Sequence, residues 1–155
     1  MVDVMDSSVE DEAALYSTAP TVGVVVGATF AKLAGVFDSA VGGDGSFLIT
    51  DAVAETVTTS STAGFTYGLG CELTFTAANN AVVDFAIAVD GTVQQYIASA
   101  TARGSSRPVS ISLSSVILSA NASSVVELYA LSTDTASLDV LDGYLLTSIR
   151  PTNNP

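Results

Sequence analysis

Apolar and polar residues alternate along most of this chain, and short runs of Gly, Asn, Asp, Ser and Pro interrupt the alternation. This is the pattern of antiparallel strands joined by turns, and no segment has a helical period long enough for a core helix. The pattern predicts strands over residues 22–26, 29–37, 46–50, 53–59, 69–77, 82–89, 92–102, 108–119, 123–131 and 138–149. We therefore expect an all-β domain over residues 21–150, a two-sheet antiparallel jelly roll or β-sandwich, which suits a single chain of 155 residues.

The clearest strand pair surrounds Asp90-Gly91. In the preceding segment, Val82–Val89, large apolar side chains fall on one face, while Asp84 and two alanines fall on the other. Asp-Gly readily adopts the positive φ angles of a two-residue hairpin, so the chain should return along the segment that begins at Thr92. Farther along, the run Val116–Leu118 breaks the alternation and indicates a bulge or a strand that crosses between sheets.

The first 20 residues are polar and acidic. Residues 7–12, which precede the apolar residues 13–16, predict the cap of one or two short helical turns that end before Pro20. The segment has too little apolar surface to fold alone, so it is either a loose tail or an arm that becomes ordered by docking on a partner. The candidate contact residues of such an arm are Asp3, Asp6, Glu10 and Tyr16. Residues 151–155 form a short tail that begins at a proline.

The chain is strongly acidic, with sixteen carboxylates, four basic residues and a net charge of −12. Such a field repels phosphate backbones and anionic lipid surfaces, so we expect neither a nucleic acid nor a membrane as a partner. The apolar stretch 21–37 is too short to span a bilayer and contains Lys32. Acidic rather than basic residues precede this stretch, which argues against a secretory signal and favours synthesis in a cytoplasm.

Charged residues make up only 13% of the chain, whereas Ser and Thr occur 20 and 17 times. The outward strand positions are therefore covered mainly by hydroxyls, and Lys and Glu, which are depleted at interface cores, are scarce. This composition favours a homo-oligomer. Arg103 and Arg107 are candidates for ion pairs with a neighbouring subunit, the alternative being two solvent-facing loop residues.

The complete absence of histidine excludes Ser-His-Asp and Cys-His catalytic arrangements and histidine-based metal sites. Paired carboxylates for glycoside hydrolysis would have to come from Glu72, Asp84 or Glu127, which are better explained as outward-facing, solvated residues. Lys32 is explained in the same way, as a strand residue whose amine reaches solvent. We expect no enzymatic activity, no catalytic residue and no cofactor.

Several short motifs have simpler structural explanations. The Gly-rich stretch 41–46 and the three Asp-Gly steps predict turns, because neither a phosphate-loop ending nor the acidic run of a calcium loop is present. Cys71 is the only cysteine, so it can form no disulfide within the chain, and we interpret it as a small buried hydrophobe. The glycosylation sequon at residues 121–123 is interpreted as a chance match.

The C-terminal part carries a family resemblance. The segments Ser110–Leu131 and Leu138–Leu146 resemble the last strands of the C1q/TNF-like trimeric jelly rolls, over about the last 40 residues. The Gly-Asp usual before the penultimate strand in that family is replaced here by residues 122–124, Ala-Ser-Ser.

Domains of this type recur in phage capsid decoration (cement) proteins, head fibres and tail-fibre tips. The resemblance implies a homotrimeric virion structural protein, made in the host cytoplasm, that decorates and stabilises the outer surface of a phage head by contact with the major capsid protein. The alternative is a receptor- or glycan-binding tip of a phage fibre, and a carboxylate-based hydrolase is a third possibility.

Overall fold

The computed structural model describes residues 12–42, 48–59, 65–119 and 123–151, and these residues form twelve strands and no helix. The strands are β1 (Glu12–Tyr16), β2 (Thr21–Val26), β3 (Ala31–Lys32), β4 (Ser39–Gly42), β5 (Leu48–Asp51), β6 (Thr56–Thr59), β7 (Phe65–Thr76), β8 (Val82–Val89), β9 (Thr92–Thr101), β10 (Val109–Ser119), β11 (Val125–Leu131) and β12 (Ala136–Pro151). The all-β prediction is confirmed. Within the described ranges, no helix is long and apolar enough to cross a membrane.

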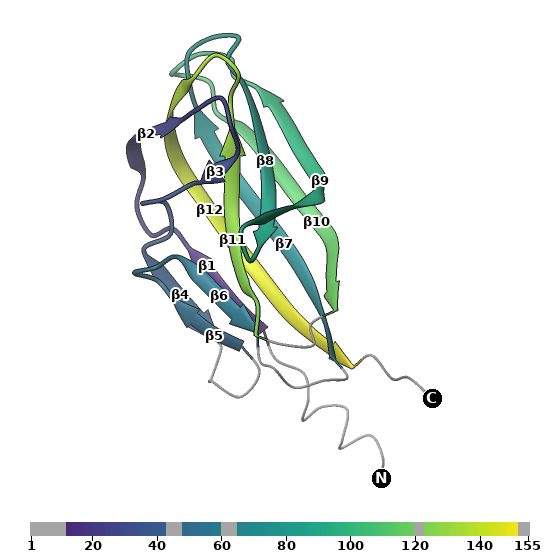
Figure 1. Cartoon of the computed structure of the whole chain (residues 1–155). Coiled ribbons are helices and arrows are strands. Elements are labelled where there is room, and N and C mark those ends of the chain that lie inside the picture. Colours follow the sequence, from purple (N-terminus) through teal and green to yellow (C-terminus); the bar gives the residue numbers. More distant parts are fainter. Residues whose placement is uncertain (1–11, 43–47, 60–64, 120–122, 152–155) are drawn as a thin grey trace.

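The strands form two antiparallel sheets that pack face to face as a sandwich (Figure 1). Sheet A has the order β10-β7-β12-β1-β4. In addition, β2 pairs with residues 136–140 at the beginning of β12. Sheet B has the order β5-β6-β11-β8-β9, with β3 paired to β11. The edge strands β9 and β10 lie against each other on one side of the sandwich, while β4 and β5 lie together on the other.

The core lies between the sheets because strand residues alternate between the two faces. On β7, which lies between β10 and β12, the buried apolar side chains are Tyr67, Leu69, Cys71, Leu73 and Phe75. The ring of Phe75 meets that of Phe85 from sheet B at a centroid distance of 5.3 Å and an interplanar angle of 56°, a tilted contact that links the two layers.

The hairpin predicted at Asp90-Gly91 is confirmed. It joins β8 and β9, and its two turn residues have φ angles of 51° and 80°. The face predicted to be apolar is buried, but the two alanines on the opposite face, Ala86 and Ala88, are buried as well. The irregularity predicted near residue 116 is a register shift in the β10–β7 pairing, between Leu113 and Val116.

The strand predicted over 22–26 is present as β2, but other elements of the N-terminal half depart from the prediction. Residues 12–16 are strand β1 and not part of a helix, because Ala13 and Leu15 alternate into the core while the backbone pairs with both β12 and β4. The long strand predicted over 29–37 is reduced to the two residues of β3. Beyond it, the chain forms a loop that Glu55 holds in place.

Glu55 is buried, and its carboxylate accepts hydrogen bonds from the backbone N–H groups of Gly35, Val36 and Phe37 at 2.5–2.6 Å. These bonds satisfy three donors that the strand ladder would otherwise have paired. The strand predicted over 53–59 is also shorter in the structure. Glu55 sits in a turn with φ of 52°, so β6 begins only at Thr56.

The two ends of the sandwich differ. The chain enters β1 and leaves β12 at the end where both termini are marked in Figure 1, and the register pairs Glu12 with Ser148 there. The connections β7–β8, β9–β10 and β11–β12 lie at the opposite end, which we call the distal end.

Candidate interface on the outer face of sheet A

The outer face of sheet A carries the side chains that alternate with the core residues of β1, β4, β7, β10 and β12. Two cross-strand rows run over its middle. One row contains Tyr16, Tyr144, Glu72 and Ser112 in register, and the next contains Val41, Ala14, Leu146 and Gly70. The rows combine aromatic, aliphatic and hydroxyl groups with one carboxylate.

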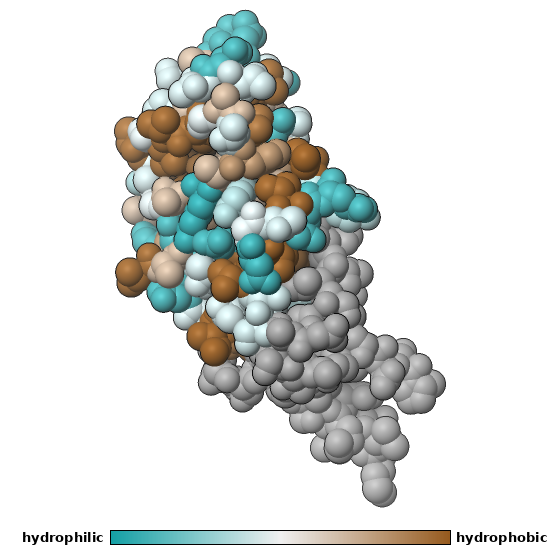
Figure 2. Space-filling view, viewed as in Figure 1, coloured by the Kyte–Doolittle hydropathy of each residue, from teal (hydrophilic) through white to brown (hydrophobic). Residues whose placement is uncertain are grey.

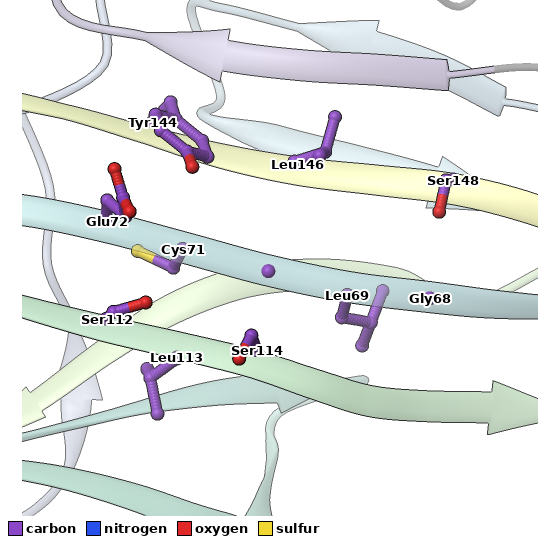
Figure 3. A pocket seen from close by; sticks show the side chains of 11 residues that line it. Gly68, Leu69, Cys71, Glu72, Ser112, Leu113, Ser114, Tyr144, Leu146 and Ser148 are labelled. Atoms are coloured by element: carbon purple, nitrogen blue, oxygen red, sulfur yellow. The ribbon is translucent and has the colours of Figure 1, made fainter.

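The centre of this face is hollow because β7 places glycines there. Gly68 and Gly70 point outward between Ser148 and Leu146 on β12 and the serines of β10, and they leave a depression of about 420 Å³ (Figure 3). Neither glycine has a positive φ angle, and a Cβ built on Gly70 would meet its nearest atom at 3.6 Å. The fold therefore does not require glycine at position 70, and such a strand glycine often marks close approach of another chain.

Large apolar side chains are exposed around the hollow. Tyr16 and Tyr144 are 36% and 37% exposed, and Val41 is 59% exposed. A second exposed apolar pair, Tyr96 and Ile97, lies on the edge strand β9. On the side of the molecule shown in Figure 2, apolar residues form separate groups among polar ones rather than one continuous patch.

Glu72 is the carboxylate beside the hollow, and it interacts with Tyr144 across the strand pair (Figure 3). Burial, the charge of Glu72 and a hydrogen bond to it raise the pKa of the Tyr144 phenol, which stays protonated. Behind this pair, burial and the charge of Glu72 raise the pKa of the Cys71 thiol to about 12. Cys71 is therefore a neutral core residue on the inner side of the sheet, in keeping with its interpretation as a buried hydrophobe.

Of the contact residues proposed from the sequence, the structure describes Tyr16, Arg103 and Arg107, and Tyr16 lies apart from the two arginines. Tyr16 lies on the outer face of sheet A beside Tyr144. Arg103 and Arg107 lie in the loop between β9 and β10 at the distal end, and neither makes an ion pair within the described residues. Asp3, Asp6 and Glu10 lie outside the described residues. Because residues 12–16 belong to sheet A, the proposed arm is reduced to residues 1–11.

The carboxylates considered for hydrolysis are separated by the sandwich. Glu72 faces outward from sheet A, whereas Asp84 and Glu127 lie on the paired strands β8 and β11 of sheet B. Glu127 forms an ion pair with Lys32 at 2.8 Å, and Asp84 accepts a hydrogen bond from Ser99. Lys32 thus has a carboxylate partner, which the sequence did not reveal. The described part of the chain holds no group of three or more acidic or cysteine side chains suited to a metal ion.

Sequence reasoning missed Gly68, Gly70, Tyr144 and Leu146. The signal for the first two was available, since Gly68, Gly70, Glu72 and Thr74 occupy alternate positions of one strand and none of them is apolar. That spacing predicts that these four residues face outward, but it does not predict which side chains of the neighbouring strands lie beside them. The pairing of β7 with β12, rather than with its sequence neighbour β8, supplies Tyr144 and Leu146.

The fold is that of the TNF-like jelly rolls. The structure is similar to that of Eiger TNF from S. frugiperda, with a TM-score of 0.54 and 7% identity over 95% of this chain and 96% of that one. It is also similar to murine APRIL, with a TM-score of 0.54 and 10% identity over 88% of this chain and 98% of that one. The vertex protein of PRD1 aligns more loosely, at a TM-score of 0.44 and 15% identity over 92% of this chain and 97% of that one.

No protein-family model matches the sequence, and a search of curated proteins finds no match. At such low identities the similarity to the solved structures establishes the fold alone.

Proposed function

We propose that this protein is a virion structural component, a homotrimer that decorates the outer surface of a phage head and stabilises it. The observation that carries the proposal is the outer face of sheet A. It is hollow at its centre, carries Tyr16, Tyr144 and Val41 as exposed apolar side chains, and has Glu72 as the carboxylate beside the hollow. Exposing apolar side chains of this face to water is unfavourable, and burying the face against another subunit removes few charged groups from water.

A trimer needs two different patches on each subunit, because a threefold ring is built from head-to-tail contacts. The second patch we assign is the β9/β10 edge, where Tyr96 and Ile97 are about half exposed. Charge supports this pairing. Residues 91–126 contain no carboxylate and hold both Arg103 and Arg107, whereas the outer face of sheet A carries Glu12 and Glu72. The edge of one subunit is thus electrostatically suited to the face of the next.

The polarity of the molecule suggests how it would sit on a particle. The chain enters β1 at the end opposite the distal loops, so residues 1–11 start from the end we place against the shell. Their acidic residues Asp3, Asp6 and Glu10 are the contacts we propose for the major capsid protein. Bridging neighbouring capsid subunits stabilises a closed shell by mass action and requires no catalytic group or cofactor. With a net charge of −12, the protein is unsuited to contact with the packaged genome.

The interface is tested by filling the hollow. The substitution Gly70→Val adds side-chain volume where a Cβ has room in the subunit, so it should leave the β-sheet circular dichroism unchanged. It should weaken assembly by about tenfold or more, because two apolar methyl groups would occupy the space of the neighbour. Light scattering over a dilution series should give three times the 15.6 kDa chain mass for the wild type and a shift toward monomer for the variant.

The control is Gly27→Val, at a glycine with no positive φ whose Cβ would meet nothing within 4 Å. It lies outside the outer face of sheet A and should remain a trimer. A wild-type protein that is monomeric throughout the series, or a Gly70→Val variant that assembles as tightly as Gly27→Val, contradicts the interface.

The role on the particle is tested separately by immunogold labelling of purified virions with antibody against the recombinant protein. Labelling distributed over the head supports decoration. Labelling confined to the ends of fibres supports the alternative, a receptor- or glycan-binding fibre tip. That alternative is favoured by one observation, a polar groove between the loops at the distal end.

A further inference from the structure

A second depression lies at the distal end of the sandwich, between the β7–β8 connection and the start and end of the β9–β10 loop. Its volume is about 650 Å³. The polar side chains that line it include Asn79, Asn80, Thr101 and Arg103, and Pro108 and Val109 contribute apolar surface. We refer to it as the distal groove. It does not share a single residue with the hollow on sheet A.

The side chains of Asn79, Asn80, Thr101 and Arg103 make no hydrogen bond or ion pair with any other described residue. Two carboxamides, a hydroxyl and a guanidinium together offer ten N–H or O–H donors and several acceptor sites. Two other lining hydroxyls are engaged, Ser99 with Asp84 and Ser110 with Thr74. The groups without a bonded partner therefore come from the β7–β8 connection, the end of β9 and the β9–β10 loop.

The backbone beneath these groups is held in place. Asn80 has a φ of 69° and donates its N–H to the carbonyl of Ala102 at 2.9 Å, while Ala102 donates to the carbonyl of Ala81 at 2.7 Å. These two bonds tie the β7–β8 connection to the β9–β10 loop. Asn79, Asn80 and Arg103 are thus presented from a framework that is ordered before any ligand arrives, which reduces the entropic cost of binding.

The lining of the distal groove carries one cation, Arg103, and a carboxylate linked to this lining, Asp84, is hydrogen-bonded to Ser99. No carboxylate occurs in residues 77–83 or 91–126, so both loops that form the distal groove are free of acidic residues in an otherwise acidic chain. Arg103 lies in the groove without a counter-ion. A guanidinium in this setting favours a single carboxylate, since charge-assisted bonds are the strong ones, while the net charge of −12 works against long polyanions.

We infer that the distal groove binds a carboxylate-bearing sugar. In this assignment Arg103 pairs with the carboxylate, and the amides of Asn79 and Asn80 and the hydroxyl of Thr101 bind ring hydroxyls. The binding itself does not depend on the proposed function. Only the outward orientation of the groove on a particle rests on it, because the groove lies at the end of the sandwich opposite to the start of β1.

The test is a titration of the wild-type protein with glucuronic acid, followed by amide chemical shifts, with glucose as the uncharged probe. We expect saturable, millimolar binding of glucuronic acid, with shifts at residues 79–81 and 101–103, and binding of glucose that is weaker by about tenfold. Arg103→Gln should weaken the binding of glucuronic acid by about tenfold and should leave the binding of glucose unchanged.

Arg107→Gln is the matched control, because it removes the same charge from the same loop at a residue that does not line the groove. It should bind glucuronic acid like the wild type. No saturable binding of glucuronic acid, equal binding of the two sugars, or equal effects of the two arginine substitutions overturns the assignment. Light scattering on both variants separates this inference from the trimer. If Arg103→Gln loses assembly while wild-type protein shows no sugar binding, Arg103 serves the subunit contact and the groove assignment is wrong.

Discussion

Glu55 shows how a single buried carboxylate can determine the path of the chain. Its two oxygens accept three backbone N–H bonds from residues 35–37, and it keeps a φ of 52°, an unfavourable angle for a non-glycine residue. Glu55→Ala should therefore lower the free energy of unfolding by about 3 kcal/mol, since two buried donors and one partly buried donor lose a charged acceptor. Glu55→Gln should lose less, because its amide oxygen still accepts. Urea unfolding measures both losses.

The matched control for this prediction is Asp134→Ala, which removes an exposed carboxylate from the β11–β12 connection. Its effect should stay within about 0.5 kcal/mol, as is usual for surface positions. Equal losses for the substitutions at positions 55 and 134 would contradict the structural role of Glu55.

The buried thiol of Cys71 should make the stability of the protein depend on pH in the alkaline range. Its thiol has a pKa of about 12 in the folded protein, against an ordinary value of 9.0. A raised pKa means that the unfolded chain ionises first, so stability is fully present below pH 9.0 and is lost as pH rises from there toward 12. This loss should reach up to about 1.4 kcal/mol per pH unit.

The comparison protein is Cys71→Ala, which lacks the titrating thiol but carries a small cavity at every pH. Below pH 9 the wild type should be the more stable of the two by a constant amount, and the difference should shrink as the pH rises above 9. Free energies of unfolding measured over this range test the prediction. A difference that stays constant with pH would show that the thiol does not titrate as expected.

At the level of elements, most strands could be predicted from the sequence, and the main exceptions, β1, β4 and the loop at residues 33–38, lie in the first half of the chain. The strand Val82–Val89 was predicted with its bounds, because strong alternation and the Asp-Gly turn act within a few residues. Residues 12–16 carry the signals of a helical turn, but they form strand β1 through pairing with β12, which is more than a hundred residues away, and with β4. The loop at residues 33–38 depends on Glu55 in the same way. Local pattern does not contain such long-range pairings.

The candidate interface was only partly predictable for the same reason. Tyr16 was named as a contact residue, but as part of an arm rather than of a sheet. The low charge and abundant hydroxyls predicted an interface without a location. The location follows from the strand order β10-β7-β12-β1-β4, which brings Gly70, Tyr144 and Tyr16 to one face.

Gly143 illustrates a constraint that acts between elements. It lies on β12 just after the register shift between Val140 and Asp142, where β12 approaches β7 closely. A Cβ at this position would lie 2.5 Å from Cδ1 of Leu73 and 3.0 Å from the carbonyl oxygen of Glu72. Gly143→Ala should therefore destabilise the fold by about 1–3 kcal/mol through overpacking.

The control is Gly27→Ala, at a position where the added Cβ meets nothing within 4 Å and φ is not positive. It should be neutral or slightly stabilising, because alanine restricts the unfolded chain more than glycine does. Thermal unfolding followed by circular dichroism distinguishes the two. A Gly143→Ala protein as stable as Gly27→Ala would mean that Leu73 and the β7 backbone move aside at little cost.

At the scale of the whole molecule, function depends on the different ends and faces of one rigid sandwich. The outer face of sheet A is assigned to subunit contacts, the distal groove to a ligand, and the end where β1 begins to the particle. The hollow on sheet A and the distal groove share no residue, so each can be altered separately, although the groove adjoins the β9/β10 edge proposed for the subunit contact. The two-layer core, with Phe75 against Phe85, provides the common support.

The particle contact is the assignment that decides the biological role. We expect virions stripped of the protein to release their genome at a lower temperature than intact virions, because a ligand that binds only the closed shell raises its stability in proportion to RT ln(1 + [L]/Kd). Adding back the full-length protein should restore the original temperature.

A chain beginning at Glu12 keeps β1 and should fold and form trimers, but without Asp3, Asp6 and Glu10 it should restore stability only at higher concentration. Genome release followed with a nucleic-acid dye measures all four states: intact virions, stripped virions, and virions restored with the full-length or the shortened chain. If stripped and intact virions release at the same temperature, the cementing role is wrong; if the shortened chain restores stability as well as the full one, contact is made by the β-sandwich and not by the arm.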